Sequence, residues 1–267
     1  MIPKKIHYCW VGGNPLPESA KKCIKSWKKY CPDYEIIEWN EQNYDFTAVP
    51  YMKEALEAKK WGFVPDYARL DIVYIHGGIY LDTDVEIVRS FDPLLELPGF
   101  AGFQDEKEVN FGQGFGAEAG NPVLKTVMES YNGMHFLKPD GDPNLTPSPQ
   151  LNTETLVMKY GLLPNDSFQE LNGMTVFPKE YFCPKSFADG VLRKTKNTYS
   201  IHHFDASWYD NEQKKDLQDR WVGFQKQKER RRLREKKLRR RKIIGGFLRR
   251  IFGDARWEKI KSILIRK

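Results

Sequence analysis

Residues 65–85 read PDYARLDIVYIHGGIYLDTDV, a stretch that combines a helix pattern, a stop signal and a strand pattern. Apolar residues recur at helical spacing from Pro65 to His76, and the following Gly77-Gly78 is typical of a helix C-terminus. The run from Ile79 to Ile87 alternates, as a half-buried strand does. If it forms one extended strand, four side chains share one of its sides: Tyr80, Asp82, Asp84 and Glu86. We therefore expect two carboxylates next to each other at a strand end.

The residues before this stretch predict a β-α-β unit. An apolar run from Ile6 to Val11 stops at Gly12-Gly13, and a second strand is expected from Tyr34 to Trp39. Between them, apolar residues at spacings of three and four after Pro17 indicate a helix, so the two strands should be parallel. Further helices are expected at 50–60 and 150–160, and a strand opening into a loop at 199–208. The chain is thus predicted to have an α/β fold.

Charge divides the chain at about residue 210. From Glu212 to Lys267 there are 22 Lys and Arg against 7 Asp and Glu, a net of +15, so the total of +7 leaves residues 1–211 at about −8. We expect a catalytic domain over 1–210 and a basic helical tail over 211–267. The tail should form a charged helix and then short amphipathic segments at Ile243–Phe252 and Trp257–Ile265. No apolar run approaches the roughly 20 residues that a membrane-spanning helix needs.

The acidic pair suits a hard divalent cation, because Mg²⁺ and Mn²⁺ prefer carboxylate oxygens and keep other positions for phosphate. Such an ion neutralises the charge that develops when a sugar leaves a nucleoside diphosphate. Alone, an Asp-x-Asp tripeptide is more often a solvated turn. Apolar residues on the opposite face of GGIYLDTDV make Asp82 and Asp84 candidate ligands of Mn²⁺ or Mg²⁺.

Three other places offer chemistry, each with a structural alternative. His202 and His203 alternate along a strand, so at most one should reach an ion held by the carboxylates, and Ser207 and Trp208 can donate to phosphate. Trp10 could be a core residue or could stack on a nucleobase beside Gly12. Asp66 and Arg69 share a helix face and could form an ordinary ion pair or bind sugar hydroxyls.

Three segments resemble glycosyltransferase family 32, the DXD-containing sugar transferases that include bacterial capsular polysaccharide enzymes, and more distantly the large glucosylating bacterial toxins. The segments are IPKKIHYCWVGG (2–13), PDYARLDIVYIHGGIYLDTDV (65–85) and IHHFDASW (201–208). The resemblance covers roughly residues 1–210 and leaves the tail outside. It implies a GT-A fold, which is a Rossmann-like nucleotide-diphospho-sugar transferase fold, and hexosyl transfer that retains the anomeric configuration.

The resemblance also implies roles for individual residues. Asp84 would bind the metal directly with Asp82, completed by His202 or His203. Asp66 and Arg69 would hold donor-sugar hydroxyls and count with the two DXD aspartates as catalytic. The remaining donor-binding residues would be Trp10, Val11, Gly12, Tyr80, Ser207 and Trp208. Phe204-Asp205-Ala206 departs from the small-residue loop usual before the Ser-Trp pair, so Asp205 could add a ligand or face solvent.

The expected partners follow from these segments. We expect a nucleotide-sugar donor, with a UDP-sugar favoured over a GDP-sugar. The expected acceptor is a glycan or a lipid-linked acceptor in polysaccharide biosynthesis. The tail should attract an anionic membrane surface and place a cytoplasmic protein at the inner face of the membrane. One rival is a sugar nucleotidyltransferase, although Gly12-Gly13-Asn14-Pro15 carries no basic phosphate-binding residue. The other rival is a nucleic-acid-binding protein acting through the tail, which lacks aromatic residues within its basic tract, so no nucleic acid is expected.

Overall fold

The parallel pair predicted near the N-terminus forms one end of a sheet of eight strands. β1 (Lys5–Cys9) pairs with β2 (Glu35–Trp39) in parallel, and α1 (Glu18–Tyr30) connects them. β1 also pairs in parallel with β3 (Gly78–Tyr80), so β1 lies between the two. The computed structural model describes residues 1–205 and 211–253. The chain divides into two compact units, Met1–Lys214 and Lys215–Lys267.

The sheet runs in the order β2-β1-β3-β7-β5-β9-β8, and β6 pairs with β5 beside this path. It mixes parallel and antiparallel pairs, because β7 is antiparallel to both of its neighbours. A second sheet has two strands, β10 and β4. The remaining strands are β4 (Val85–Ile87), β5 (Gly99–Phe103), β6 (Val109–Asn110), β7 (Phe115–Ala117), β8 (Gln169–Leu171), β9 (Met174–Phe177) and β10 (Ser200–His202).

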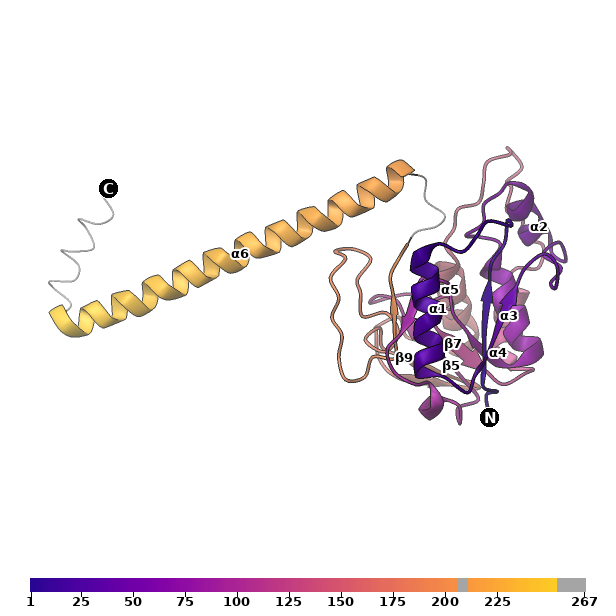
Figure 1. The fold of residues 1–267 in the computed structure, drawn as a ribbon, viewed down its shortest axis with the longest axis horizontal. Coiled ribbons are helices and arrows are strands. Elements are labelled where there is room, and N and C mark those ends of the chain that lie inside the picture. Colours follow the sequence, from indigo (N-terminus) through magenta and orange to yellow (C-terminus); the bar gives the residue numbers. More distant parts are fainter. Residues whose placement is uncertain (206–210, 254–267) are drawn as a thin grey trace. The chain divides into compact units, whose positions relative to one another are not determined.

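Helices cover both faces of the main sheet (Figure 1). On one face, α3 packs against β1 and against α4, which in turn contacts α5. On the other face, Trp27 of α1 belongs to the buried cluster that contains Ile6 of β1 and Ile79 of β3, and α1 also packs against β4 of the second sheet. The helices of the first unit are α2 (Pro50–Glu57), α3 (Pro65–His76), α4 (Pro122–Glu129), α5 (Ser148–Tyr160) and the short 3₁₀ helix η1 (Asp92–Leu94). This arrangement confirms the predicted α/β fold class.

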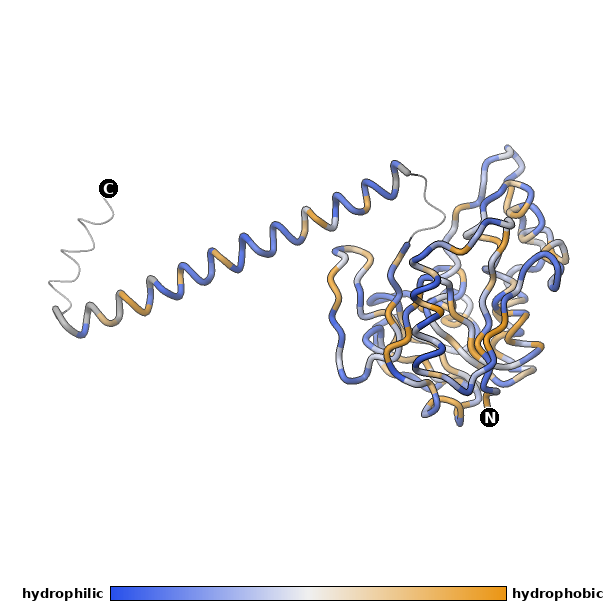
Figure 2. Tube along the Cα trace, in the orientation of Figure 1, coloured by the Kyte–Doolittle hydropathy of each residue, from blue (hydrophilic) through white to orange (hydrophobic). Residues whose placement is uncertain are grey.

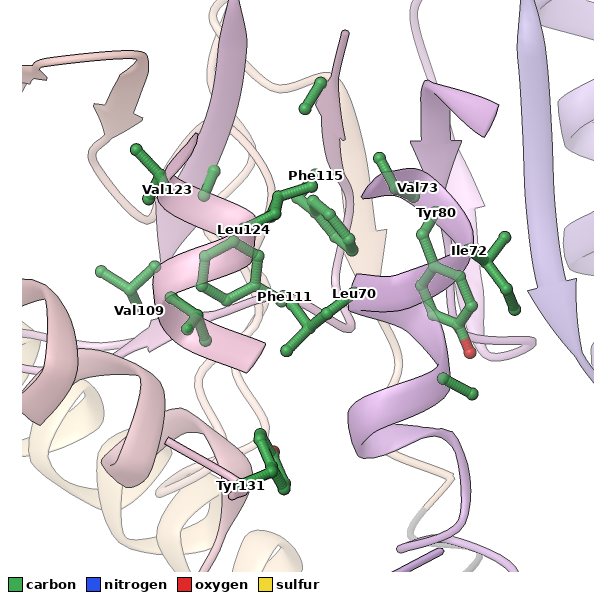
Figure 3. Packing of buried hydrophobic residues seen from close by; sticks show 14 of the residues in the cluster. Leu70, Ile72, Val73, Tyr80, Val109, Phe111, Phe115, Val123, Leu124 and Tyr131 are labelled. Carbon is green, nitrogen blue, oxygen red and sulfur yellow. The ribbon is translucent and has the colours of Figure 1, made fainter. Parts of the chain in front are cut away.

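Two buried apolar clusters correspond to the two faces. On β3, Tyr80 belongs to the cluster that contains α3, whereas Ile79 belongs to the cluster that contains Trp27 of α1. This alternation is what a strand buried on both sides requires. Figure 3 shows Leu70 of α3 lying beside Phe111 and Phe115 in the first cluster. Packing therefore holds the middle of α3, and the helix ends at Gly77, whose φ is 61°.

The Gly-rich stretch 99–120, for which no strands were predicted, contains three of them: β5, β6 and β7. Glycine is needed there because aromatic rings lie directly over the backbone. A Cβ on Gly102 would lie 2.5 Å from the Phe182 ring, and a Cβ on Gly116 would lie 2.7 Å from the Phe100 ring. Low strand propensity therefore concealed real strands, since tertiary packing overrides propensity.

In its described residues, the second unit consists of one long helix, α6 (Asn211–Phe252), whose first residues belong to the first unit (Figure 1). The expectation of a separate amphipathic segment at Ile243–Phe252 is wrong, because the charged helix continues through it without a break. The Trp257–Ile265 segment lies outside the described residues. Within the described part of the chain, no helix is both long enough and apolar enough to cross a bilayer.

Candidate active site

The two aspartates of the DXD segment meet through a turn and not along one strand. β3 ends at Tyr80, and the amide of Val85 donates to the carbonyl of Asp82 at 3.0 Å, which closes a turn over Thr83 and Asp84. After the turn, β4 leaves the main sheet and pairs with β10. The expectation of a single strand from Ile79 to Ile87 is therefore wrong. The turn nevertheless keeps both carboxylates together.

β10 brings a histidine to this turn. The antiparallel pairing sets His202 opposite Val85, the residue that follows Asp84. The Nε2 atom of His202 lies 3.3 Å from Oδ1 of Asp84, and both side chains are largely buried. Asp82, Asp84 and His202 each offer a ligand atom, and these atoms lie within 4.8 Å of one another. Two elements distant in sequence thus build one polar cluster.

The pKa values of this pair follow from its mutual contact. Burial would raise the pKa of Asp84, but the charge and hydrogen bond of His202, with the amide of Asp205, outweigh burial and hold that pKa at about 2. Burial would lower the pKa of His202, but Asp84 outweighs it and raises the pKa to about 10. An ion-free site therefore holds an imidazolium beside a carboxylate. A cation that binds here has to displace that proton.

The residues after His202 follow the DXD turn closely. The amide of His203 donates to the carbonyl of Asp84 at 3.0 Å, and the amide of Asp205 donates to its Oδ2 at 2.9 Å. Phe204 between them has a φ of 59°, a left-handed conformation that is uncommon for an aromatic residue. Such conformations persist only where surrounding contacts enforce them, and they concentrate at functional sites.

His203 lies on the other side of β10 from His202. Its Nε2 atom contacts Oε2 of Glu86 at 2.9 Å, and both side chains are partly exposed. Alternation along the strand thus separates the two imidazoles, as expected, and places His202 in the cluster with Asp82 and Asp84. Glu86, expected on the same side as the aspartates, pairs with His203 instead.

A buried arginine on α3 joins two carboxylates. Its Nη2 atom lies 2.6 Å from Oδ1 of Asp66, and its Nη1 atom lies 3.6 Å from Oδ2 of Asp82. Arg69 and Asp66 face the same way because they are three residues apart on the helix. Burial would lower the pKa of Arg69, but Asp82 and Asp66 outweigh it and raise the pKa, so the guanidinium stays charged. Its Cζ atom also lies 5.6 Å from the centre of the Tyr80 ring.

Gly112 provides the space that this arrangement needs. Its carbonyl accepts from the amide of Asp82 at 2.8 Å. A Cβ on Gly112 would lie 2.1 Å from Oδ2 of Asp82 and 2.5 Å from Nη1 of Arg69, so even a methyl group would overlap the carboxylate. The sequence does not predict this role for Gly112. Its signal was the Gly-rich stretch itself, which does not say which glycine lies against a charged group.

The polar cluster lies on the wall of a cavity of about 1160 Å³, which is large enough for more than one small-molecule group. Several predicted donor-binding residues also line it: Trp10, Val11, Asp66, Arg69, Tyr80 and Asp82. Gly12 does not line it, and its amide donates to Glu41 at 2.6 Å instead. Ser207 and Trp208 lie outside the described residues.

Trp61, a second tryptophan on the cavity wall with Trp10, was not predicted from the sequence. Its ring lies 3.0 Å from the place of a Cβ on Gly12, whose φ is 90°. The absence of a side chain at Gly12 therefore leaves room for the indole of Trp61. The indole nitrogen of Trp10 donates to the carbonyl of Asn14 at 2.5 Å, which fixes that ring at the cavity wall.

The donor set fits a hard divalent cation. Carboxylates from two aspartates and one imidazole can take part of an octahedral shell, and the open cavity leaves the remaining positions to ligand oxygens. Nearby, the Asp66 and Arg69 side chains present an acceptor and donors suitable for hydroxyl groups. The site can therefore bind a phosphorylated, hydroxyl-rich ligand.

Comparison with known proteins gives an independent description of this region. Residues 17–100 match the family model described as "Glycosyltransferase sugar-binding region containing DXD motif". Inositol phosphoceramide mannosyltransferase 3 of Schizosaccharomyces pombe is 32% identical over 48% of this chain and 37% of its own length. The uncharacterized glycosyltransferase L373 of Acanthamoeba polyphaga mimivirus is 26% identical over 69% of this chain and 74% of its own length.

Among solved structures, the PaToxG glycosyltransferase is similar at 18% identity and a TM-score of 0.46, over 59% of this chain and 69% of that chain. The chain spans only 37% and 46% of two of the yeast mannosyltransferases that it matches.

Proposed function

We propose that this protein is a metal-dependent hexosyltransferase that uses a nucleotide-diphosphate sugar, a proposal supported by the match of residues 17–100 to the family model of DXD-containing glycosyltransferases. The observation that carries the proposal is the convergence of Asp82, Asp84 and His202 within 4.8 Å on a cavity wall shared with Trp10. Relatives named as mannosyltransferases support transfer of a hexose.

Mn²⁺ or Mg²⁺ would be held by Asp82, Asp84 and His202, and when bound it would neutralise the charge of the departing diphosphate. The remaining donor-binding tasks fall to residues of this chain. Trp10 is held at the cavity wall in a position to stack on the base. Asp66 and Arg69 bind the hydroxyls of the sugar, and their mutual contact fixes the geometry of both before the donor arrives.

Transfer with retention of configuration is the expected outcome. The Asp66 carboxylate is held by Arg69 at 2.6 Å and is 6% exposed, so it is a poor nucleophile for the anomeric carbon. This supports a front-face mechanism in which the departing phosphate accepts the proton of the acceptor hydroxyl. Such a mechanism needs no paired carboxylates of the kind used in glycoside hydrolysis.

A panel of UDP- and GDP-sugars, GDP-mannose included, tests the activity through Mn²⁺-dependent hydrolysis. We expect turnover of a UDP-sugar, and a loss of about 100-fold or more in Asp84→Asn, because that change removes charge stabilisation of the leaving group. Glu86→Gln is the matched control, since it neutralises a carboxylate two residues away that pairs with His203 outside the cluster. It should keep the hydrolysis rate within a few-fold.

Two results would contradict the proposal. One is that no nucleotide-sugar is hydrolysed and none raises the unfolding temperature in the presence of Mn²⁺. The other is that Asp84→Asn and Glu86→Gln behave alike, because the acidic pair would then have no special part in catalysis.

We further propose that α6 holds the protein at an anionic membrane surface, on the inner face of a membrane where polysaccharide or glycolipid acceptors are assembled. Figure 2 shows that most of α6 is hydrophilic, with scattered apolar positions. Towards its end, Ile243, Ile244 and Phe247 are exposed. Each Lys or Arg near such a surface contributes about 1 kcal/mol, and exposed apolar side chains can enter the interface.

Sedimentation with vesicles tests this second proposal. Full-length protein should bind vesicles that contain phosphatidylserine, should bind phosphatidylcholine vesicles weakly, and should dissociate as salt is raised. Single-stranded RNA is the informative competitor. If RNA displaces the protein from the vesicles at equal charge concentration, or if binding ignores lipid charge, the membrane assignment is wrong.

A further inference from the structure

The loop between β5 and β6 forms a rigid wall of the cavity. The amide of Gln104 donates to the carbonyl of Glu108 at 2.7 Å, which closes the loop. Inside it, Oδ1 of Asp105 accepts from the amides of Lys107 and Glu108, each at 2.8 Å. Because these bonds fix the backbone on both sides, the Gln104 and Glu108 side chains are held in place before any ligand binds.

A line of hydrogen bonds connects this loop to the DXD turn. The amide of Gly112, whose carbonyl holds Asp82, donates to Oδ1 of Asn110 at 2.6 Å. Nδ2 of Asn110 donates to Oε1 of Gln104 at 2.9 Å, and Nε2 of Gln104 donates to Oε2 of Glu108 at 2.9 Å. Asp82, Gln104, Glu108 and Asn110 all line the same cavity. The acidic pair and Glu108 thus belong to one connected polar surface.

Among the described residues, Glu108 is one of several cavity carboxylates without a cationic partner, Asp105 and Glu180 being others. Within residues 1–205 and 211–253, no Lys, Arg or His side chain forms an ion pair with it, and its one side-chain hydrogen bond comes from an amide. Burial, and then the charge of Asp105, raise the pKa of Glu108, so the fold leaves its charge poorly compensated. Three other cavity carboxylates have cationic partners: Asp66 with Arg69, Glu106 with Lys179, and Asp189 with Arg193.

We propose that Glu108 and Gln104 bind hydroxyl groups of a neutral acceptor sugar or polyol, an inference that rests on the proposed glycosyltransferase function. A carboxylate and an amide side by side can accept from and donate to hydroxyls, and a charged acceptor strengthens such bonds. The connection through Asn110 and Gly112 sets the position of this subsite relative to Asp82.

The charge of Glu108 also selects against anionic acceptors at this wall. A phosphate placed beside a carboxylate without a counter-charge would be repelled in a partly desolvated cavity. The cavity also has apolar lining at Leu145, Pro147 and Pro149, which suits the C–H faces of a sugar ring. The part of the acceptor next to Glu108 is therefore uncharged, even if a charged or lipid group is attached elsewhere in the molecule.

Binding measured by saturation-transfer NMR tests the inference on full-length protein loaded with UDP and Mn²⁺. The probes are methyl glycosides of glucose, galactose and mannose, together with the corresponding sugar 6-phosphates. We expect at least one neutral glycoside to bind more tightly than its phosphate. Glu108→Gln should weaken that neutral glycoside about tenfold, the effect of losing one charged hydrogen bond, and should narrow its advantage over the phosphate.

Glu154→Gln is the matched control. Glu154 accepts from Gln150 on α5, is exposed, and contributes to the charge around Glu108 without lining the cavity. It should leave both glycoside binding and the rate of donor hydrolysis unchanged. Equal glycoside binding by wild type and Glu108→Gln, preference for the phosphates, or no glycoside binding by a protein that hydrolyses its donor would each overturn the inference. Absence of any donor hydrolysis would instead overturn the proposed function.

Discussion

Two arginine–carboxylate pairs, each formed within one helix, show how differently the two units use charge. Arg69 and Asp66 on α3 are 5% and 6% exposed, and Arg69 reaches on towards Asp82. Arg231 and Glu235 on α6 lie 3.2 Å apart and are 82% and 61% exposed. Local helix geometry is similar in both, but the first pair has been removed from water and the second has not.

The difference shows that the fold determines which charges matter. A buried pair contributes little net stability when intact, yet removal of one partner leaves an uncompensated charge in the interior. An exposed helix pair is screened by water and salt, and its loss changes little. The first unit should therefore be sensitive to single changes in its charges, whereas α6 should respond to its total charge.

The largest effect is expected from Arg69→Met, which keeps an apolar stem and removes the guanidinium. Asp66 and Asp82 would lose their shared cation, and we expect about 3–5 kcal/mol less free energy of unfolding, measured by urea denaturation. The double variant Arg69→Met with Asp66→Asn should recover part of the loss. If the single variant costs under about 1 kcal/mol, the pair is solvated and its buried position is wrong.

A smaller effect on stability is expected from a glycine-to-alanine change in each unit. The change should lower stability in the first unit and raise helix stability in α6. Gly112→Ala places a methyl group 2.1 Å from Oδ2 of Asp82 and should cost about 1–3 kcal/mol, with loss of donor hydrolysis. Gly223→Ala in α6 meets nothing within 4 Å and should raise helix content, by about 1 kcal/mol in helix stability. Urea denaturation measures the loss of unfolding free energy in Gly112→Ala, and circular dichroism measures the gain of helix content in Gly223→Ala. A neutral Gly112→Ala would refute the contact.

The pH dependence of stability should reveal a buried neutral histidine on β1. Trp39 donates to Nδ1 of His7 at 3.1 Å, so Nε2 carries the proton and donates to the carbonyl of Gly77. Burial lowers the pKa of His7 from 6.5 to about 4. Between pH 6.5 and pH 4, His7 is protonated in the unfolded chain but stays neutral in the folded chain. The free energy of unfolding therefore falls as pH drops through this range and levels off near pH 4.

Between pH 7 and pH 5 this histidine should cost about 1–2 kcal/mol of unfolding free energy. The measurement is urea denaturation at both pH values, for wild type and for His7→Gln, which keeps an amide donor and acceptor. The variant should have a smaller pH-dependent loss, whatever its stability at pH 7. An identical loss in both proteins would show that His7 titrates normally in the folded state.

The smallest effect is expected on the exposed pair. Glu235→Gln should change the free energy of helix formation in α6 by less than about 0.5 kcal/mol, because an exposed i,i+4 pair contributes no more. The helix content measured by circular dichroism should therefore change little. The same change adds one to the net positive charge of the tail, so binding to anionic vesicles should strengthen slightly. A large loss of helix content would mean that α6 depends on individual pairs, and the contrast with α3 would disappear.

Most of the first 90 residues could be predicted from sequence because local signals agree with tertiary packing there. The 65–76 helix has the predicted bounds, and β1 and β2, which precede it in sequence, form the predicted parallel pair. The prediction of a single strand over Ile79–Ile87 failed, because alternation does not distinguish one strand from two strands joined by a turn. The turn depends on β10, a segment far along the chain, for which the local pattern holds no information.

The candidate site was predictable in its charged residues but not in its supporting ones. Asp82 and Asp84 stood out because an acidic pair at a strand end suits a divalent cation. The imidazole was narrowed to His202 or His203, and the structure brings His202 to the pair. Gly112 and Trp61 did not stand out, because what matters is the space next to each of them. Such spaces are created by packing between segments that have no common local pattern.

The pairing of β4 with β10 also has a consequence for the order in which the protein is made. Residues 17–100 carry the family signature, yet His202 and the backbone that holds Asp84 come about a hundred residues later. On the ribosome, the aspartates emerge well before their imidazole partner, so the nascent chain carries an unfinished site until β10 has been synthesised. A fragment cut at the end of the family match would keep the motif and lose the half of the site that positions it.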